Sequence, residues 1–432
     1  MRDLSPSIEA RVRARLDARL DGEARSPLAL ALSGGGDSLA LALMAARWAQ
    51  EHSRTLLILT VDHGLNPNSL GWTRACGETA RRIGARFQAL EWTGPRPSSG
   101  LPAAARQARH RLLAQAAREA GARVLLMGHT LDDVAEAGAM RAGGSTTPSP
   151  REWAPSPAWP EGRDVFLLRP LLGMGRQSLR DWLIAQGETW IEDPGNLDPR
   201  FARSRARTTL AGRPPAPVSD CTLSPDRQAA ADLALRVEAR PFGLEIPRRV
   251  LRNAAPDAAR RVIATACLSA GGGVRAPRGG RLDRLAARLA GSELFQATLA
   301  GALILAENDR VAFGRAAGEM RRQGVCDLVL PADGEAVFDG RFQVEATSAV
   351  RIMPLEGRLS HLAAADRNRL ATVPPAFRGA LLGVEAGGAF RLAGTLASGV
   401  RIRPLARRRL LAACGSTPDE AAATALSQEG SG

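Results

Sequence analysis

The chain contains no lysine, so all 58 residues of the lysine and arginine class are arginine. This absence excludes a Walker A nucleotide site, because that motif needs a lysine on the terminal phosphates. A GC-rich genome would explain arginine in place of lysine, but it would not explain the formal net charge of +14. Such an excess favours a polyanionic partner such as a nucleic acid, since a planar guanidinium can bind two phosphate oxygens.

Cysteine is also scarce, and no two cysteines form a C-x-x-C pair. The five residues are Cys76, Cys221, Cys267, Cys326 and Cys414. Their scatter excludes a zinc ribbon or a disulfide framework and fits a reducing cytoplasm, where we expect most of them to be small buried groups. The N-terminus lacks the apolar core of a signal peptide, and no run reaches the roughly eighteen apolar residues of a membrane span. These absences predict a cytoplasmic protein without a membrane partner.

A glycine-rich loop is the most informative feature that is present. Its residues are Ser33, Gly34, Gly35, Gly36, Asp37 and Ser38. Apolar runs at 28–32 and 39–48 predict a buried strand before it and a helix after it. A strand, a glycine turn and a helix N-terminus in series offer free N–H groups to an anion, which predicts a phosphate site; the alternative is a turn without a ligand. Asp37 would repel phosphate unless a cation lay between them, which indicates magnesium-bound pyrophosphate.

Strand and helix signals alternate along the first half of the chain. The predicted strands are 28–32, 55–61, 87–92 and 124–127, and the predicted helices include 72–83 and 103–120. Repeated βα units predict an α/β fold with a doubly wound, mostly parallel sheet, whose ligands bind at the carboxyl ends of the strands. The glycine-rich loop, Asp62-His63 and Gly128-His129 all follow such strand ends.

Proline and glycine divide the chain into three predicted domains. These are an α/β ATP-binding domain at 1–212, a helical middle domain at 213–317 and a small α+β C-terminal domain at 318–432. We expect helices at 226–237 and 258–268 and strands at 344–352 and 399–402. The segment 143–162 carries five prolines, which predicts a loop or a disordered insertion.

An acidic turn follows the fourth predicted strand. Glu136 lies four residues after Asp132 and three after Asp133, so the three acids share one helical turn. The next basic residue is Arg141, and because no basic partner is near in the sequence, we predict that this turn binds a cation. Acids in a first turn also complement the helix dipole without any ligand, which is the alternative. His129 at the strand end is either a binding residue or a packed one.

A third cluster runs from Trp190 to Arg207. Asp193 opens an Asp-Pro-Gly-Asn sequence that predicts a turn. Arg200, Arg203 and Arg207 would share one face of a helix that follows it. The two interpretations of this face are a solvated basic surface and a contact with RNA or ATP phosphate.

These pieces, in this order, resemble tRNA(Ile)-lysidine synthetase, a family of PP-loop ATP pyrophosphatases. The matching motifs are the glycine-rich loop, Asp62-His63-Gly64-Leu65, Ala105-Arg106-Gln107-Ala108-Arg109, Gly128-His129 with Asp132-Asp133 and Glu136, Arg169-Pro170-Leu171-Leu172, and 190–207. They cover most of residues 25–210. The resemblance implies an ATP-dependent ligase that adenylates the position-2 oxygen of the wobble cytidine in a CAU anticodon. L-lysine then displaces AMP through its ε-amine, which forms lysidine.

The resemblance also implies a role for each candidate residue. The phosphates of ATP would be held by Ser33, Gly34, Gly35, Gly36 and Ser38, and Mg²⁺ by Asp37, while the adenosine would lie near Asp62 and His63. Lysine would be bound by His129, Asp132, Asp133 and Glu136. Phosphate or developing charge would be neutralised by Arg106, Arg203 and Arg207. The implied partners are tRNA(Ile) with a CAU anticodon and L-lysine, and a homodimer is left open.

The chain departs from the family pattern at His110, Ala137 and Ser204, and in the proline-rich segment. These positions concern the substrate pocket rather than the adenylation loop. Two rival functions remain open. A PP-loop tRNA thiolase would commonly carry paired cysteines, which the sequence lacks, whereas a non-catalytic RNA-binding protein would not need Asp37 or the acidic turn.

Overall fold

The computed structural model describes residues 7–94, 96–145, 147–193, 198, 202–210, 224–394 and 399–428. The chain divides into two compact units. Unit 1 comprises Met1–Thr222 and Pro418–Ser427, and unit 2 comprises Leu223–Thr417 and Gln428–Gly432. The chain therefore returns to unit 1 after it has completed most of unit 2. The predicted boundary between residues 212 and 213 lies outside the described residues, and the division into three domains stays a prediction.

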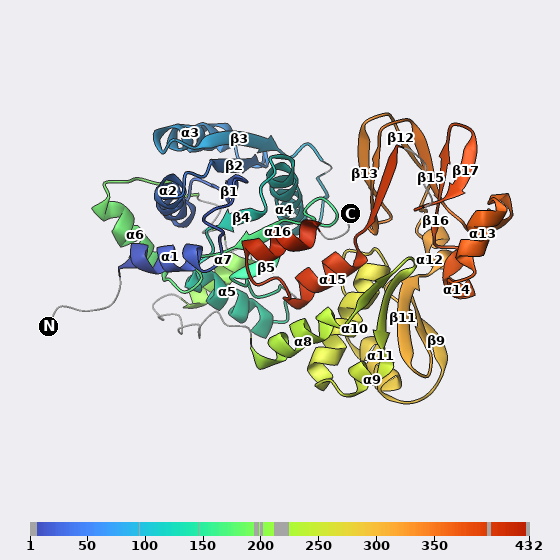
Figure 1. The fold of residues 1–432 in the computed structure, drawn as a ribbon. Coiled ribbons are helices and arrows are strands. Elements are labelled where there is room, and N and C mark those ends of the chain that lie inside the picture. The colour runs from blue at the N-terminus through green and yellow to red at the C-terminus, as the bar shows by residue number, and fades with distance from the viewer. Residues whose placement is uncertain are drawn as a thin grey trace. The chain divides into compact units, whose positions relative to one another are not determined.

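Unit 1 alternates helices and strands along the chain (Figure 1). Its elements are α1 (Ile8–Asp17), β1 (Leu28–Ala31), α2 (Gly36–Glu51), β2 (Leu56–Asp62), α3 (Ser69–Arg82), β3 (Arg86–Glu91), α4 (Leu101–Glu119), β4 (Val124–Met127), α5 (Leu131–Ala142), β5 (Trp153–Pro155), β6 (Phe166–Leu168), α6 (Arg176–Ala185), α7 (Ala202–Leu210) and α16 (Glu420–Gln428). The sheet order is β3-β2-β1-β4-β6-β5, and each pair is parallel except β5 with β6. The predicted α/β fold with a mostly parallel sheet is confirmed.

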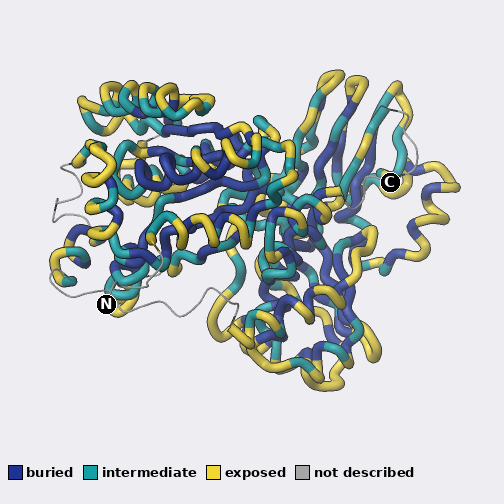
Figure 2. Tube along the Cα trace, turned by 60° about the vertical axis from the view of Figure 1, so that its left-hand side comes forward, coloured by how far each residue is buried: buried dark blue, intermediate teal, exposed yellow. Residues whose placement is uncertain are grey.

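The central strand β1 is buried on both faces. Leu28 and Leu30 pack with residues of α1, α2, α3 and α6 on one face, and Ala29 packs with residues of α4 on the other. Helices on both faces explain why β1 is a continuous apolar run rather than an alternating one. The strands β1, β4 and β6 are buried, whereas the edge strand β3 is mostly exposed; buried stretches of the chain are dark blue in Figure 2. β1 lies between β2 and β4, so the strand order reverses at its carboxyl end, where doubly wound folds bind ligands.

The proline-rich segment 143–162 is not a plain loop or a disordered insertion, which corrects the prediction. Its residues Trp153–Pro155 form β5, the antiparallel edge of the sheet. Trp153 stacks on Phe166 with 5.0 Å between the ring centroids. Proline is tolerated at such an edge because the missing N–H removes no bond from the sheet interior.

The described residues of unit 2 form three antiparallel sheets, ordered β7-β8-β11-β10-β9, β12-β15-β16-β17 and β13-β14-β18. Its helices are α8 (Pro225–Leu235), α9 (Arg248–Arg252), α10 (Pro256–Ala270), α11 (Gly280–Ala290), α12 (Ala317–Arg322), η2 (Leu359–His361), α13 (Ala364–Leu370), α14 (Pro375–Arg378) and α15 (Ala406–Cys414). Its strands are β7 (Glu238–Arg240), β8 (Gly243–Pro247), β9 (Phe295–Leu299), β10 (Ala302–Ala306), β11 (Arg310–Arg315), β12 (Leu328–Leu330), β13 (Gly334–Phe338), β14 (Phe342–Ala346), β15 (Val350–Pro354), β16 (Leu382–Ala386), β17 (Ala389–Leu392) and β18 (Val400–Pro404).

The middle region has both the predicted helices, α8 and α10, and a five-stranded sheet that was not predicted. The hairpin between β9 and β10 turns at Ala300 and Gly301, with φ of +51° and +81°. A two-residue turn with two positive φ angles matches the twist of the paired strands, but it usually carries asparagine, aspartate or glycine at its first position. Alanine there conceals the hairpin from sequence reasoning. In the C-terminal region, the single strand expected at 344–352 is two strands, β14 and β15.

Helix α16 is attached to the rest of unit 1 by a buried ion pair. The guanidinium of Arg54 donates to both carboxylate oxygens of Glu420 at 2.8 Å. The Glu420 carboxylate also accepts from the Asp21 N–H at 3.0 Å. The side chains of Arg54 and Glu420 are 1% and 0% exposed. Within the described ranges, no helix combines the length and apolar character that crossing a bilayer requires.

Candidate active site at the carboxyl end of the sheet

The glycine-rich loop connects β1 to α2, as predicted. Helix α2 begins at Gly36, and its N-cap residue Gly35 makes no side-chain capping bond, so the first N–H groups of the helix are available to an anion. Gly34 has a φ of +83°, in the left-handed region that favours glycine. The Ser38 hydroxyl closes the turn, because it accepts from the Ser33 N–H at 3.2 Å and donates to the Gly35 carbonyl at 2.9 Å.

Trp190 and Ile191 cover the glycines of this loop. The Ile191 N–H donates to the Gly34 carbonyl at 3.0 Å. A Cβ atom at Gly34 would lie 2.5 Å from Cδ1 of Ile191, and one at Gly36 would lie 3.4 Å from the Trp190 ring. The third predicted cluster therefore packs directly on the loop, although Pro194–Leu197 of its turn and Arg200 lie outside the described residues.

Asp62 and His63 lie at the end of β2, the strand next to β1. Asp62 accepts a hydrogen bond from the Gly64 N–H at 2.7 Å. The His63 ring meets Trp92 edge to face at 6.0 Å, and its Nδ1 is buried without a hydrogen-bond partner among the described residues. Burial, and then the charge of Arg109, lower the pKa of His63, so the imidazole is neutral at pH 7 and offers polar nitrogens rather than charge.

The acidic turn begins helix α5, beside the phosphate loop. Asp133 caps the helix reciprocally with Thr130, whose N–H and hydroxyl lie 2.7 and 3.0 Å from the Asp133 carboxylate. Asp133 and Glu136 are buried, with only 7% and 2% of their surfaces exposed. A Cβ atom at Gly128 would lie 2.9 Å from Cα of Ser38, so the chain that leads into α5 packs against the start of α2.

The acidic turn has basic partners, which corrects the prediction that it has none. Arg203 Nε lies 2.8 Å from Glu136, and a second nitrogen of Arg203 pairs with Asp133. Arg207 Nε lies 2.8 Å from the other oxygen of Glu136. Both arginines come from α7, so the prediction that they share a helical face is confirmed. The interpretation of that face as merely solvated is wrong, because both arginines pair with the buried Glu136. The arginines lie 67 and 71 residues after Glu136, so no local sequence pattern reveals the pairing.

Arg176 is the site residue that sequence reasoning missed. Its Nε lies 3.1 Å from Asp37, its Nη1 3.2 Å from Glu136 and its Nη2 3.7 Å from Asp133. Its backbone N–H, at the first residue of α6, donates to Asp132 at 2.7 Å. One guanidinium thus joins the phosphate loop to the acidic turn.

Burial and charge act in opposite directions on this network. Burial raises the pKa of Asp37, although Arg176 opposes the rise. Burial also acts to raise the pKa of Glu136, but hydrogen bonds from the arginines of α7 outweigh it, so that pKa lies below its ordinary value. The pKa of Arg176 is raised, because the neighbouring acids outweigh the effect of burial. The network has four carboxylates and three guanidiniums, so its net charge is −4 + 3 = −1 when all are ionised. The carboxylates are those of Asp37, Asp132, Asp133 and Glu136, and the guanidiniums are those of Arg176, Arg203 and Arg207.

A basic cluster lies beside the acidic turn. Arg169 Nε donates to Nδ1 of His129 at 3.1 Å, and burial, then Arg169, hold the pKa of His129 well below its ordinary value. Burial lowers the pKa of Arg109 to about 10, and its Nε is buried without a hydrogen-bond partner in the described part of the chain. The pKa of Arg106 is lowered by burial and then by Arg203. Like charges held together in this way favour the binding of an anion.

The described residues include no group of three or more histidine, cysteine or acidic side chains placed to hold a metal ion. A magnesium ion at Asp37 would therefore take its other ligands from water and from substrate phosphates, which is how nucleotide enzymes usually hold it. Asp37 fits that role, because its side chain is 22% exposed at the start of α2. Three of the four described cysteines, Cys76, Cys267 and Cys414, are buried, as expected, and Cys326 is exposed.

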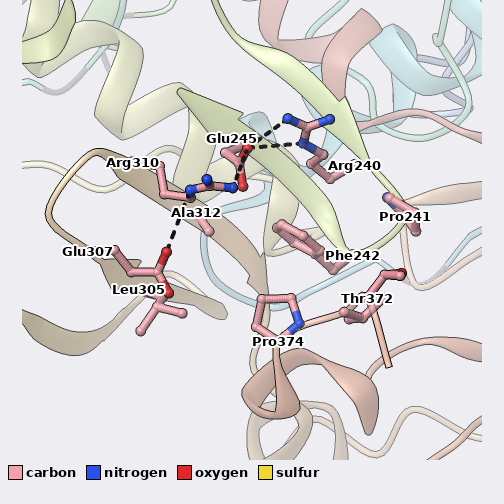
Figure 3. Close-up of a pocket in the computed structure, with 11 residues that line it drawn as sticks. Arg240, Pro241, Phe242, Glu245, Leu305, Glu307, Arg310, Ala312, Thr372 and Pro374 are labelled. Carbon is pink, nitrogen blue, oxygen red and sulfur yellow. Dashed lines mark hydrogen bonds and ion pairs between the residues drawn. The ribbon is translucent and has the colours of Figure 1, made fainter. Parts of the chain in front are cut away.

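Unit 2 contains a cavity of about 410 Å³ (Figure 3). Its charged lining residues pair with one another: Arg240 lies 2.8 Å from Glu245, and Arg310 lies 3.7 Å from Glu245 and from Glu307. None of the predicted site residues lines this cavity. Because its charges are already paired, we do not assign the triphosphate or the amino acid to it.

Comparisons with known proteins show what this chain is similar to. A PP-loop domain family matches residues 8–213. The tRNA(Ile)-lysidine synthase of Caulobacter vibrioides is 47% identical over 372 residues, which cover 86% of each chain. That of Hyphomonas neptunium is 34% identical and covers 71% of this chain and 84% of its own. Among solved structures, the U34-tRNA thiolase NcsA of Methanococcus maripaludis covers 47% of this chain and 70% of its own at 18% identity, with a TM-score of 0.38.

Proposed function

The chain belongs to the tRNA(Ile)-lysidine synthase family and is an ATP-using ligase of the PP-loop type, and from that premise we propose that its site joins L-lysine to the wobble cytidine of tRNA(Ile) with a CAU anticodon. In the first step the position-2 oxygen of the base attacks the α-phosphate of ATP, and pyrophosphate leaves. In the second step the ε-amine of lysine attacks carbon 2 of the base, and AMP leaves with that oxygen. One observation supports this most: Arg176 contacts both the phosphate loop and the acidic turn.

The phosphates of ATP bind at the start of α2 in this proposal. The N–H groups of Gly34, Gly35 and Gly36 and the hydroxyl of Ser33 offer the donors. The Ser38 hydroxyl, which donates to the Gly35 carbonyl, keeps the loop in this shape. Asp37 would hold a magnesium ion together with the phosphates. The ion, when bound, offsets the negative charge of the departing pyrophosphate.

The adenosine of ATP lies near the end of β2. The carboxylate of Asp62 can accept from a sugar hydroxyl, and the unpartnered Nδ1 of His63 offers a further polar contact. The His63 ring packs edge to face with Trp92, which restricts the orientation of the imidazole.

Lysine binds between the acidic turn and the basic cluster. The carboxylates of Asp133 and Glu136, supported by Asp132, attract an ammonium group, and the neutral His129 borders the same space. Because the pKa of Glu136 is below its ordinary value, this carboxylate stays ionised and acts as a cation ligand rather than as a strong base. An amine must lose its proton before it attacks, so another group or water takes that proton.

Arginines neutralise the charge that develops on the phosphates. Arg106, Arg203 and Arg207 face the same space as the acidic turn, and preorganised guanidiniums stabilise such charge more effectively than water does. The net charge of +14 supports wider contact with tRNA phosphates, which we assign to residues 213–317 and 318–432.

Transfer of radiolabelled lysine tests the proposal. We expect label to enter transcribed tRNA(Ile) with a CAU anticodon when ATP is present, and no label to enter a transcript with a changed wobble base. Asp37→Ala should reduce transfer by at least about 10²-fold, because it removes the carboxylate that would hold the magnesium ion and so the ion's stabilisation of the transition-state charge. The matched control is Asp181→Ala, which removes an exposed acid of α6 and should leave transfer unchanged. Absence of label with the wild-type chain refutes the function, and transfer that survives Asp37→Ala refutes the role of the loop.

A further inference from the structure

We propose that Arg176 is a positioning residue that keeps the lysine site occupied by its own guanidinium until Asp37 is engaged by magnesium and ATP, so that ATP binding strengthens lysine binding. This inference rests on the proposed function and adds to it a coupling between the ATP site and the lysine site.

Arg176 is anchored at its backbone and adjustable at its tip. Its N–H donates to Asp132 at 2.7 Å, and the N–H of Leu131 donates to the Met174 carbonyl at 2.9 Å. These two bonds fix the start of α6 against the start of α5. The guanidinium extends from this fixed point to Asp37 on one side and to Glu136 on the other. A flexible side chain on a fixed backbone can exchange partners without any movement of the helices.

Arg176 differs from the other arginines of the network. Arg203 and Arg207 pair with the acidic turn, whereas Arg176 pairs with the acidic turn and with Asp37 at once. Its side chain is 17% exposed, compared with 39% for Arg203 and 33% for Arg207. Arg176 is therefore the guanidinium whose position depends on both candidate substrate sites.

Competition for the two carboxylates then links the sites. A cation at Asp37 takes the oxygen that Arg176 Nε now contacts, and nearby phosphates attract a guanidinium that has lost that partner. As the guanidinium turns towards the phosphates, its contact with Glu136 weakens, and the Glu136 oxygen that Arg176 shares with Arg207 gains an acceptor position for the ammonium of lysine. By reciprocity, lysine must strengthen ATP binding by the same factor.

Equilibrium dialysis of radiolabelled lysine measures this coupling. For the wild-type chain, we expect the Kd for lysine to fall by about 5- to 150-fold when magnesium and a non-hydrolysable ATP analogue are added. Arg176→Gln removes the positive charge and leaves the network at −2 instead of −1. We expect this variant to bind lysine more tightly than wild type without nucleotide and to lose most of the response to the analogue. Arg176→Lys, which keeps the charge but cannot reach both carboxylates, should have intermediate coupling.

Arg47→Gln is the matched control. Arg47 lies on α2 and is 51% exposed, with Glu9 as its ionic partner, so its loss should leave the coupling at the wild-type value. A wild-type Kd that does not respond to the analogue overturns the proposal, and so does an unchanged response in Arg176→Gln. If Arg176→Gln does not fold, unchanged coupling in Arg176→Lys overturns it instead. Lysine transfer to tRNA by a wild-type chain without coupling would refute the role of Arg176 and leave the proposed function standing.

Discussion

Two ion-pair networks of unit 1 use the same chemical groups in different settings. The pair of Arg54 and Glu420 is closed, because each side chain is at most 1% exposed and the two meet in a bidentate contact. The network of Arg176, Asp37 and Glu136 is open, because Asp37 and Arg176 are 22% and 17% exposed and one guanidinium serves several acids.

The difference shows which network can exchange partners. Removing a partner from the closed pair leaves a buried charge that no water can reach, so the pair is tied to folding. The open network carries one more carboxylate than guanidinium, and a bound cation can replace a guanidinium there without leaving a charge unpaired. The same residue types therefore hold the chain together at one place and bind substrates at the other.

The largest effect on stability should come from the closed pair. We expect Glu420→Gln to reduce the free energy of unfolding by about 3–5 kcal/mol, because Arg54 would remain charged and buried without its partner. Urea denaturation measures the loss, and lysine transfer per folded molecule should stay at the wild-type level.

Glu51→Gln is the matched control for that measurement. Glu51 is 46% exposed and lies 2.6 Å from Arg13, and such surface pairs contribute about 0–1 kcal/mol. Equal losses in the two variants would mean that burial does not distinguish the pairs, and the contrast between the networks would disappear.

The sequence predicted the parts of the site that one stretch of chain contains. Glycine, aspartate and apolar runs mark each of these parts within six or eight residues. The parts are the glycine-rich loop, the ends of β2 and β4, and the acidic turn. The pairing of Glu136 with Arg203 and Arg207 depends on the return of the chain some 70 residues later, as the separations of 67 and 71 residues show. Arg176 follows closely after the matched Arg169-Pro170-Leu171-Leu172, which was the one signal that pointed to it.

The folds of the two units were unequally predictable for a similar reason. The inner strands β1, β2 and β4 of unit 1 are mostly continuous apolar runs, and sequence patterns mark them well. The short strand β6 was not predicted. The strands β9 and β11 of unit 2 mix polar with apolar residues, and the hairpin from β9 to β10 turns through an alanine. Helix α16 joins unit 1 through Glu420, which pairs with a residue 366 positions earlier, and nothing local in the sequence indicates that contact.

An intermediate effect should come from the acidic side of the open network. We expect Glu136→Gln to raise the KM for lysine by about tenfold or more, because a hydrogen bond to a charged group contributes about 1.5–3 kcal/mol. Pyrophosphate release in the absence of lysine should change little, since Asp37 and the loop remain. Steady-state kinetics at varied lysine, together with a pyrophosphate assay, separates the two steps. Equal loss of both activities would remove Glu136 from the lysine site.

The smallest effect concerns the contribution of Asp37 to the free energy of unfolding. Burial raises the pKa of Asp37 in the folded chain above its ordinary value of 3.8. At a pH between the folded and the ordinary pKa, the folded chain therefore binds more protons than the unfolded chain does. The free energy of unfolding therefore falls as the pH rises through that interval, and the full cost is present at neutral pH. Asp37→Asn removes this cost. We expect a higher Tm than wild type at pH 7, a gain that shrinks as the pH approaches 3.8, and loss of lysine transfer at every pH.

Asp181→Asn, at an exposed position of α6, should leave the Tm and the transfer activity unchanged at pH 7. Arg176 retains Glu136 and Asp133 as partners in Asp37→Asn, so the variant does not create a second unpaired charge. A lower Tm for Asp37→Asn at pH 7 would mean that the contact with Arg176 stabilises the fold by more than the burial of Asp37 costs. The open network would then resemble the closed one, and its carboxylate would be held for structure rather than kept available for a cation.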